Sequence, residues 1–187
     1  MAGDDERRPR LIASDLDGTF LSPDGSVTAT NHAAVEQATA CDVPFVFATG
    51  RPSRWLGCLD GVSQEQSLVV VSNGAAVFDL ATQALSAVRS IETDDVLAVT
   101  TRIRETLPQV AFGLEYPVGF ACEPRVPPDD SIFFTSGPVQ ELVQIDAVMK
   151  ILVFSDVFSS EELHTRLHGV IGRRCETTYS ATAMPAS

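Results

Sequence analysis

The chain has 187 residues, 44% of them hydrophobic and 20% charged, and its 25 acidic residues outnumber 13 Lys and Arg to give a net charge of -12. This composition is typical of a globular protein of one or two domains, and the negative charge argues against nucleic acid or an anionic membrane as a partner. Residues 1–9 are interpreted as a charged tail and not a signal segment, and no apolar run in the sequence approaches the ~20 residues of a membrane span.

The first elements alternate between strand and helix. Residues 10–15 form a short apolar run that ends on a carboxylate, which predicts a buried strand. The polar stretch 18–27 predicts turns, and either Thr28 or Thr30 is suited to cap a helix that runs to about residue 41.

The pattern then repeats. Residues 43–49 predict a second strand, followed by a helix with Pro52 at its first position. Residues 68–72 predict a third strand, and segments 76–80 and 85–89 predict a hairpin. Alternating strands and helices favour right-handed crossovers and a parallel sheet, so residues 10–91 are expected to form an α/β domain.

The second half of the sequence predicts a different order of helices and strands. A helix is expected over 94–107, capped by Thr93. It is followed by strands over 110–116 and 118–123, an apolar segment at 132–135, a short helix over 138–145, a strand over 148–155, a helix over 160–170 and a strand over 173–180. Short helices with a mainly antiparallel sheet predict an α+β domain over residues 92–187, with the boundary near 90–93.

Polar residues follow each of the first three expected strands. Asp15 and Asp17 stand in the sequence DLDGT, and two carboxylates at this spacing point to the same side of an extended chain. Thr49, Gly50 and Arg51 follow the second strand and offer a hydroxyl, an unhindered amide and a cation to a phosphoryl group. Ligands bind at the carboxyl ends of strands in open α/β sheets, so these residues predict a site there.

The third strand ends in Ser72-Asn73-Gly74, where the Asn73 amide is a further candidate. Each group also has a structural alternative. The two aspartates suit turns or helix caps, Thr49 and Arg51 suit a cap and a surface ion pair, and Asn73-Gly74 is equally typical of a hairpin turn.

Three segments, LIASDLDGTFLSPDG, VPFVFATGR and VVVSNGAAVFD, together resemble the haloacid dehalogenase-type phosphatase superfamily, in its Cof-like branch. The resemblance implies a Rossmann-like core with a partial parallel sheet and an α+β cap domain. It implies that Asp15 is the nucleophile and Asp17 the general acid and base. Thr49 and the Gly50 amide would hold the phosphoryl group, with Arg51 and Asn73 as helpers.

These roles agree with the chemistry of the residues. A phosphate monoester and a carboxylate repel each other, and Mg²⁺ held by Asp15 and Asp17 would offset that repulsion. Attack by Asp15 would form an aspartyl phosphate and divide one difficult displacement into two. We therefore expect a phosphatase for a small phosphorylated metabolite, such as a sugar phosphate.

The sequence departs from the family in its second half. A lysine and an acidic metal loop are expected after the cap, but Lys150, the only lysine, opens an expected cap strand and is interpreted as a surface residue. We therefore expect a C-terminally incomplete chain that has little phosphatase activity by itself and leaves its first strand as an open edge.

The sequence leaves two alternative functions open. The first is a phosphomutase of the same fold, and the second is a non-catalytic remnant or phosphate-binding module. The substrate and the oligomeric state are not specified by the sequence.

Other side chains received simpler interpretations. The four cysteines lack the spacing of a disulfide framework or zinc cluster, so we expect buried, reduced thiols and a cytoplasmic location. His164 and His168 are expected on a solvated helix face, and Trp55 in the core.

Overall fold

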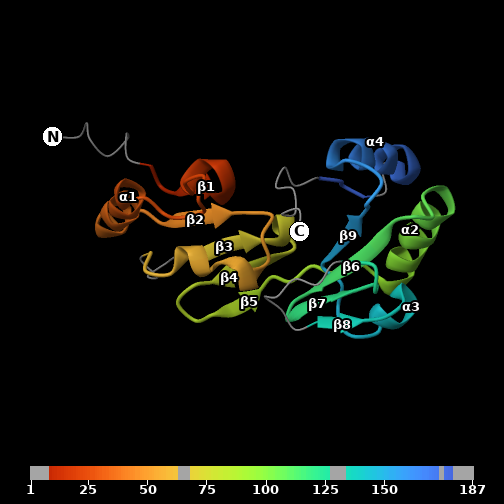
Figure 1. The fold of residues 1–187 in the computed structure, drawn as a ribbon. Coiled ribbons are helices and arrows are strands. Elements are labelled where there is room, and N and C mark those ends of the chain that lie inside the picture. Colours follow the sequence, from red (N-terminus) through yellow and green to blue (C-terminus); the bar gives the residue numbers. More distant parts are fainter. Residues whose placement is uncertain (1–8, 63–67, 127–133, 173–174, 179–187) are drawn as a thin grey trace. The chain divides into compact units, whose positions relative to one another are not determined.

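A computed structural model describes residues 9–62, 68–126, 134–172 and 175–178. The chain divides into two compact units, Met1–Arg89 and Ser90–Ser187, each with its own sheet (Figure 1).

The first unit contains a mixed five-stranded sheet. In the order β1-β2-β3-β4-β5, its strands are β1 (Ile12–Asp15), β2 (Phe45–Ala48), β3 (Leu68–Val71), β4 (Ala76–Asp79) and β5 (Ala84–Ser86). Strands β1, β2 and β3 are parallel, while β4 and β5 continue the sheet as an antiparallel hairpin. This arrangement confirms the expected α/β class, and it places β1 at one edge of the sheet that the described residues form.

Helix α1 (Ala29–Ala40) joins β1 to β2 and contributes to the core of the first unit. Its start is fixed by Thr28, whose side chain accepts a hydrogen bond from the backbone N–H of Asn31. Phe20 and Phe45 both pack against Phe47, with ring centroids 4.7 and 4.9 Å away, and Phe47 is fully buried. Because the sequence keeps aromatic residues at alternate positions of β2, one face of that strand builds this core.

The second unit pairs a four-stranded sheet with three helices. In the order β8-β7-β6-β9, its strands are β6 (Ala111–Tyr116), β7 (Gly119–Cys122), β8 (Phe134–Ser136) and β9 (Lys150–Phe154). Its helices are α2 (Thr93–Thr106), α3 (Val139–Leu142) and α4 (Ser160–Ile171). Strand β6 runs antiparallel to both of its neighbours, whereas β7 and β8 are parallel.

The helices of the second unit share one hydrophobic core with one face of its sheet. Phe112 and Leu114 of β6 are fully buried in this core together with Val96 of α2. The opposite side of β6 is also buried, where Ala111 joins a second cluster around Phe120. Since both faces are covered, all six residues of β6 are buried.

Some expected elements are wrong in detail. Pro52 does not begin an α-helix: two short 3-10 turns, Ser53–Trp55 and Gly57–Leu59, follow instead. Glu92 and not Thr93 occupies the capping position of α2, where its side chain makes no capping hydrogen bond. Residues 175–178 form no strand, and the other parts of the strand expected over 173–180 lie outside the described residues.

Three side chains are placed differently from their sequence interpretations. Trp55 is 41% exposed and therefore does not belong to the core. Lys150 is only half exposed, and burial lowers its pKa while the charge of Glu115 opposes this effect. Cys41 is exposed, although Cys122 is buried as expected.

None of the helices in the described ranges is long and apolar enough to cross a bilayer.

Candidate active site

The carboxyl ends of β1, β2 and β3 form one row across the first sheet. Asp15 is in register with Ala48, and Ala48 with Val70. The residues that follow these positions therefore leave the sheet side by side, because neighbouring parallel strands end at the same edge. The structure thus brings the three sequence motifs to one edge of the sheet.

The segment after β1 turns sharply at the second aspartate. Asp15 and Asp17 both have extended backbone angles, and Gly18 follows with φ of 77°. This left-handed conformation favours glycine at position 18. The neighbouring hydrophobic residues, Leu16 and Phe20, are buried, whereas both carboxylates lie at the surface. The turn therefore anchors its apolar side chains and leaves its acidic ones accessible.

The segment after β2 presents a hydroxyl beside an uncrowded backbone. Thr49 is 6% exposed, and its hydroxyl accepts a hydrogen bond from the backbone N–H of Arg51 over 3.1 Å. The Thr49 O–H group keeps its own hydrogen for donation to an anionic oxygen. A Cβ atom at Gly50 would lie 3.3 Å from both terminal atoms of the Asn73 side chain. Glycine at position 50 therefore lets the Asn73 amide approach this backbone.

The segment after β3 is a left-handed turn. Ser72, Asn73 and Gly74 have φ angles of 50°, 59° and 95° in succession. Two backbone bonds tie this turn to the loop after β2: Ser72 N–H donates to the Arg51 carbonyl (2.9 Å), and Asn73 N–H donates to the Thr49 carbonyl (3.1 Å). Consecutive left-handed residues are unfavourable, so these bonds help to maintain the conformation that sets Asn73 against Gly50.

Arg51 connects the second strand end to the first. Its Nη2 lies 2.5 Å from Oδ1 of Asp17, and its Nε donates to both oxygens of the same carboxylate over 3.2 and 2.9 Å. Hydrogen bonding to Asp17 raises the pKa of Arg51, so the guanidinium keeps its charge. The structure therefore joins two predicted site residues directly, with the Arg51 side chain 26% and the Asp17 side chain 53% exposed.

Asp15 is also at the strand ends but stands apart from this network. Within the described ranges, its carboxylate makes no hydrogen bond or ion pair, and its side chain is exposed. It is therefore accessible to a ligand.

The two aspartates are the candidate metal ligands of the site. In the described part of the chain, no group of three or more His, Cys, Asp and Glu side chains gathers as a metal centre would require. Two exposed carboxylates still fit Mg²⁺, which is commonly held by one or two carboxylates together with substrate phosphate and water. Asp15 and Asp17 therefore suit a metal that is bound together with its substrate.

Sequence reasoning missed two contributors to the site, the Trp55 carbonyl and the Cys58 thiol. Both belong to the 3-10 turns that replace the expected helix, and both lie against Nη1 of Arg51, at 3.3 and 3.6 Å. A backbone carbonyl carries no signal in a sequence, and an isolated cysteine carries none for this role.

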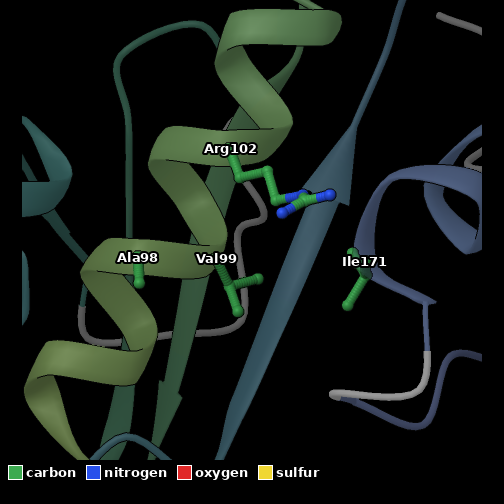
Figure 2. A pocket seen from close by; sticks show the side chains of 4 residues that line it. All are labelled: Ala98, Val99, Arg102 and Ile171. Atoms are coloured by element: carbon green, nitrogen blue, oxygen red, sulfur yellow. The ribbon is translucent and has the colours of Figure 1, made fainter.

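The second unit has a small pocket between α2 and α4, lined by Ala98, Val99, Arg102 and Ile171 (Figure 2). Arg102 Nε donates to the carbonyl of Val170 over 2.7 Å. This hydrogen bond links α2 to α4, which gives Arg102 a structural role. His164 of α4 contacts the Thr177 carbonyl at 3.2 Å, so it is packed against the chain and not fully solvated.

Comparison with known proteins gives consistent results. The profile of haloacid dehalogenase-like hydrolases matches residues 12–115. A protein of Buchnera aphidicola subsp. Schizaphis graminum is 35% identical over 71 residues, covering 38% of this chain and 26% of that relative. The HMP-PP phosphatase of Escherichia fergusonii is 24% identical over 181 residues, covering 92% of this chain and 64% of its own length.

Solved structures share the fold at low identity. A protein of Bacteroides thetaiotaomicron, analysed among phosphatases of the haloalkanoate superfamily, superposes with a TM-score of 0.71 at 17% identity and covers 92% of this chain. A subclass IIB sugar phosphatase superposes with a TM-score of 0.67 at 18% identity and covers 87% of this chain. The present chain spans 64% of each of these two structures.

The profile match extends over more than half of the chain and includes all three strand-end motifs. It confirms the family resemblance that those motifs carry. The chain belongs to the haloacid dehalogenase-like hydrolase family.

Proposed function

We propose that this protein is a Mg²⁺-dependent phosphatase that hydrolyses a small phosphorylated metabolite through an aspartyl-phosphate intermediate. The observation that carries the proposal is the convergence of Asp15, Asp17, Thr49 and Arg51 at the ends of neighbouring parallel strands. The phosphatase names of relatives support the reaction class.

In the first step, a carboxylate oxygen of Asp15 attacks phosphorus. A bond forms from this oxygen to phosphorus, the bond from phosphorus to the leaving-group oxygen breaks, and Asp17 gives its proton to the departing alcohol. Thr49 O–H, Gly50 N–H and the Asn73 amide provide donors for the phosphoryl oxygens. The exposed Asp15 carboxylate suits this role because no protein contact has to be broken before attack.

In the second step, water attacks the phosphorus of the aspartyl phosphate. Asp17 accepts a proton from that water, and the bond to Asp15 breaks, which releases inorganic phosphate and restores both carboxyl groups. When Mg²⁺ is bound, Asp15 and Asp17 would hold it, and it would supply positive charge that offsets repulsion between carboxylate and phosphate.

Arg51 takes part by sharing its charge between two anions. Its Nε and Nη2 face the Asp17 carboxylate, on the side where the phosphoryl group would lie. A planar guanidinium can bind carboxylate and phosphate oxygens with the same donors. We therefore assign Arg51 to phosphate binding and to the placement of Asp17.

The test compares the purified chain with its Asp15→Asn variant, using p-nitrophenyl phosphate and MgCl₂. Because the chain is expected to have little activity by itself, we expect slow phosphate release by the parent chain and its loss in the variant. After acid quenching, we expect a phosphoprotein in the parent chain alone. Asp24→Asn is the matched control, because the Asp24 carboxylate accepts hydrogen bonds from Ser26 within its own turn.

Undiminished hydrolysis by Asp15→Asn would refute the nucleophile assignment. Binding of inorganic phosphate without turnover would instead support a phosphate-binding module. With a sugar phosphate as the substrate, isomerised sugar phosphate in place of free phosphate would identify a phosphomutase.

A further inference from the structure

The guanidinium of Arg51 is held on two sides. Nε and Nη2 face Asp17, whereas Nη1 donates to the Trp55 carbonyl over 3.3 Å and lies 3.6 Å from Sγ of Cys58. Sγ of Cys58 is itself 3.9 Å from the same carbonyl oxygen. All three nitrogens of the guanidinium therefore have an acceptor close by.

The contacts on the Nη1 side are neutral, unlike the contact with Asp17. Burial raises the pKa of the Cys58 thiol, so this group offers a thiol and not a competing thiolate. The Trp55 carbonyl carries only a partial charge. These groups can therefore orient Arg51 without drawing its charge away from the carboxylate.

We propose that Cys58, with the Trp55 carbonyl, positions Arg51 so that the Nε–Nη2 edge stays directed at Asp17 and at a phosphoryl oxygen bound beside it. The inference rests on the proposed phosphatase function, and it assigns a positioning residue and not a catalytic one. The physical basis is the fork geometry of arginine: two parallel hydrogen bonds require one orientation of the plane, and contacts at Nη1 reduce the number of alternatives.

The local fold explains why this contact depends on the 3-10 turns. Cys58 lies in the turn Gly57–Leu59, whose Leu59 is 1% exposed and whose Leu59 N–H donates to the Leu56 carbonyl over 2.8 Å. The turn is therefore fixed by its own buried residue and backbone bond. Replacement of the Cys58 side chain should leave its backbone in place.

The experiment uses Cys58→Ala, Cys58→Ser and the control Cys41→Ala, whose native thiol is exposed next to the end of α1. In ¹⁵N-labelled protein, the Nε–Hε resonance of Arg51 is assigned by its absence in Arg51→Lys. We expect Cys58→Ala to shift or broaden this resonance and Cys41→Ala to leave it unchanged. Thermal unfolding checks that each variant folds.

A second measurement is a double-mutant cycle with inorganic phosphate as the titrant in MgCl₂. We expect Cys58→Ala to weaken phosphate binding ~3- to 10-fold when Arg51 is present and to have no effect in the Arg51→Ala background, since coupled neighbours are non-additive. Serine keeps a hydroxyl near Nη1, so Cys58→Ser should recover part of the affinity.

The outcomes separate the two proposals. An unchanged Arg51 resonance in Cys58→Ala, or an equal loss of phosphate affinity with and without Arg51, overturns the positioning role. If the parent chain neither binds phosphate nor hydrolyses a monoester, the proposed function fails. The resonance comparison still decides the positioning role in that case.

Discussion

Arg51 and Asp17, which are 34 positions apart in the sequence, meet through a contact of 2.5 Å between Nη2 and Oδ1. The contact joins the ends of β1 and β2, where the proposed nucleophile and phosphate ligands also lie. Its two partners differ in accessibility, because the Asp17 side chain is 53% exposed and that of Arg51 26% exposed. An ion pair of this kind is better suited to organising a site than to stabilising a fold.

Arg51→Ala should therefore change the free energy of unfolding by no more than ~1 kcal/mol, as solvent screens the pair. The free energy of phosphate binding should change by more than the free energy of unfolding, because the substitution removes a bidentate donor from the site. Urea unfolding and phosphate titration of the same preparations measure both effects. Arg51→Lys serves as the comparison, since it keeps the charge without the fork. A stability loss of several kcal/mol with unchanged phosphate affinity would show that the pair is structural.

The turn after β3 allows a prediction about stability. Ser72 is 3% exposed, and its Oγ atom lacks a hydrogen-bond partner within the part of the chain that the structure describes. Ser72→Ala removes a buried polar atom and should raise the free energy of unfolding by about 1 kcal/mol. Gly74→Ala should lower it by ~1–2 kcal/mol, because φ is 95° there. Urea unfolding compares the two variants; a destabilised Ser72→Ala would mean that the hydroxyl is bonded in solution.

The sequence predicted the strand ends well because the apolar runs and the polar residues after them are local patterns. The sequence also predicted a parallel sheet, and the observed register of β1, β2 and β3 brings the three strand ends to one edge. A surface ion pair was one of the alternatives for Arg51, but its partner Asp17 was not predicted. The placement of the Arg51 side chain also depends on the chain path after Pro52. That path differs from the expected helix, and the two 3-10 turns it forms supply the contacts to Nη1.

The left-handed turn at Ser72 is a second feature that could not be predicted from the sequence. Asn73-Gly74 is typical of turns, and glycine, asparagine and aspartate are the residues that adopt positive φ most readily. The sequence therefore does not predict a positive φ angle for the serine at position 72. Its conformation is understandable only from the backbone bond between Ser72 and Arg51, which comes from another strand.

Packing at Gly113 in β6 leads to a third prediction. A Cβ atom at this position would lie 2.4 Å from Cζ and 2.6 Å from Cε2 of Phe120. Gly113→Ala should therefore lower the free energy of unfolding by ~1–3 kcal/mol through overpacking. Gly169→Ala is the matched control, because a Cβ atom there meets nothing within 4 Å; in helix α4 it should stabilise by up to ~1 kcal/mol. Replacing the Phe120 ring with the smaller leucine side chain, in the double variant Gly113→Ala/Phe120→Leu, should recover part of the lost free energy of unfolding. If the effects of the two substitutions simply add, overlap between the new Cβ atom and the ring is not the cause of the loss.

Tyr116 gives the second unit a dependence on alkaline pH. Burial raises its pKa to about 12, and its hydroxyl donates to the Leu142 carbonyl over 2.7 Å. An unfolded tyrosine loses its proton near pH 10. Between about pH 10 and 12 the unfolded state therefore binds fewer protons than the folded state, so the free energy of unfolding falls as the pH rises. Below pH 10 the contribution of the neutral hydroxyl is fully present.

Tyr116→Phe should cost about 1 kcal/mol at pH 8 through loss of the hydrogen bond. Two units of pKa difference correspond to roughly 2–3 kcal/mol, so the stability advantage of the parent chain over Tyr116→Phe should vanish or reverse by pH 12. Urea unfolding of both proteins at pH 8, 10 and 11.5 follows the difference between them, which cancels the other titrating groups. A difference that stays constant over this range would show that the phenol ionises equally in both states, and that the buried hydrogen bond does not hold its proton.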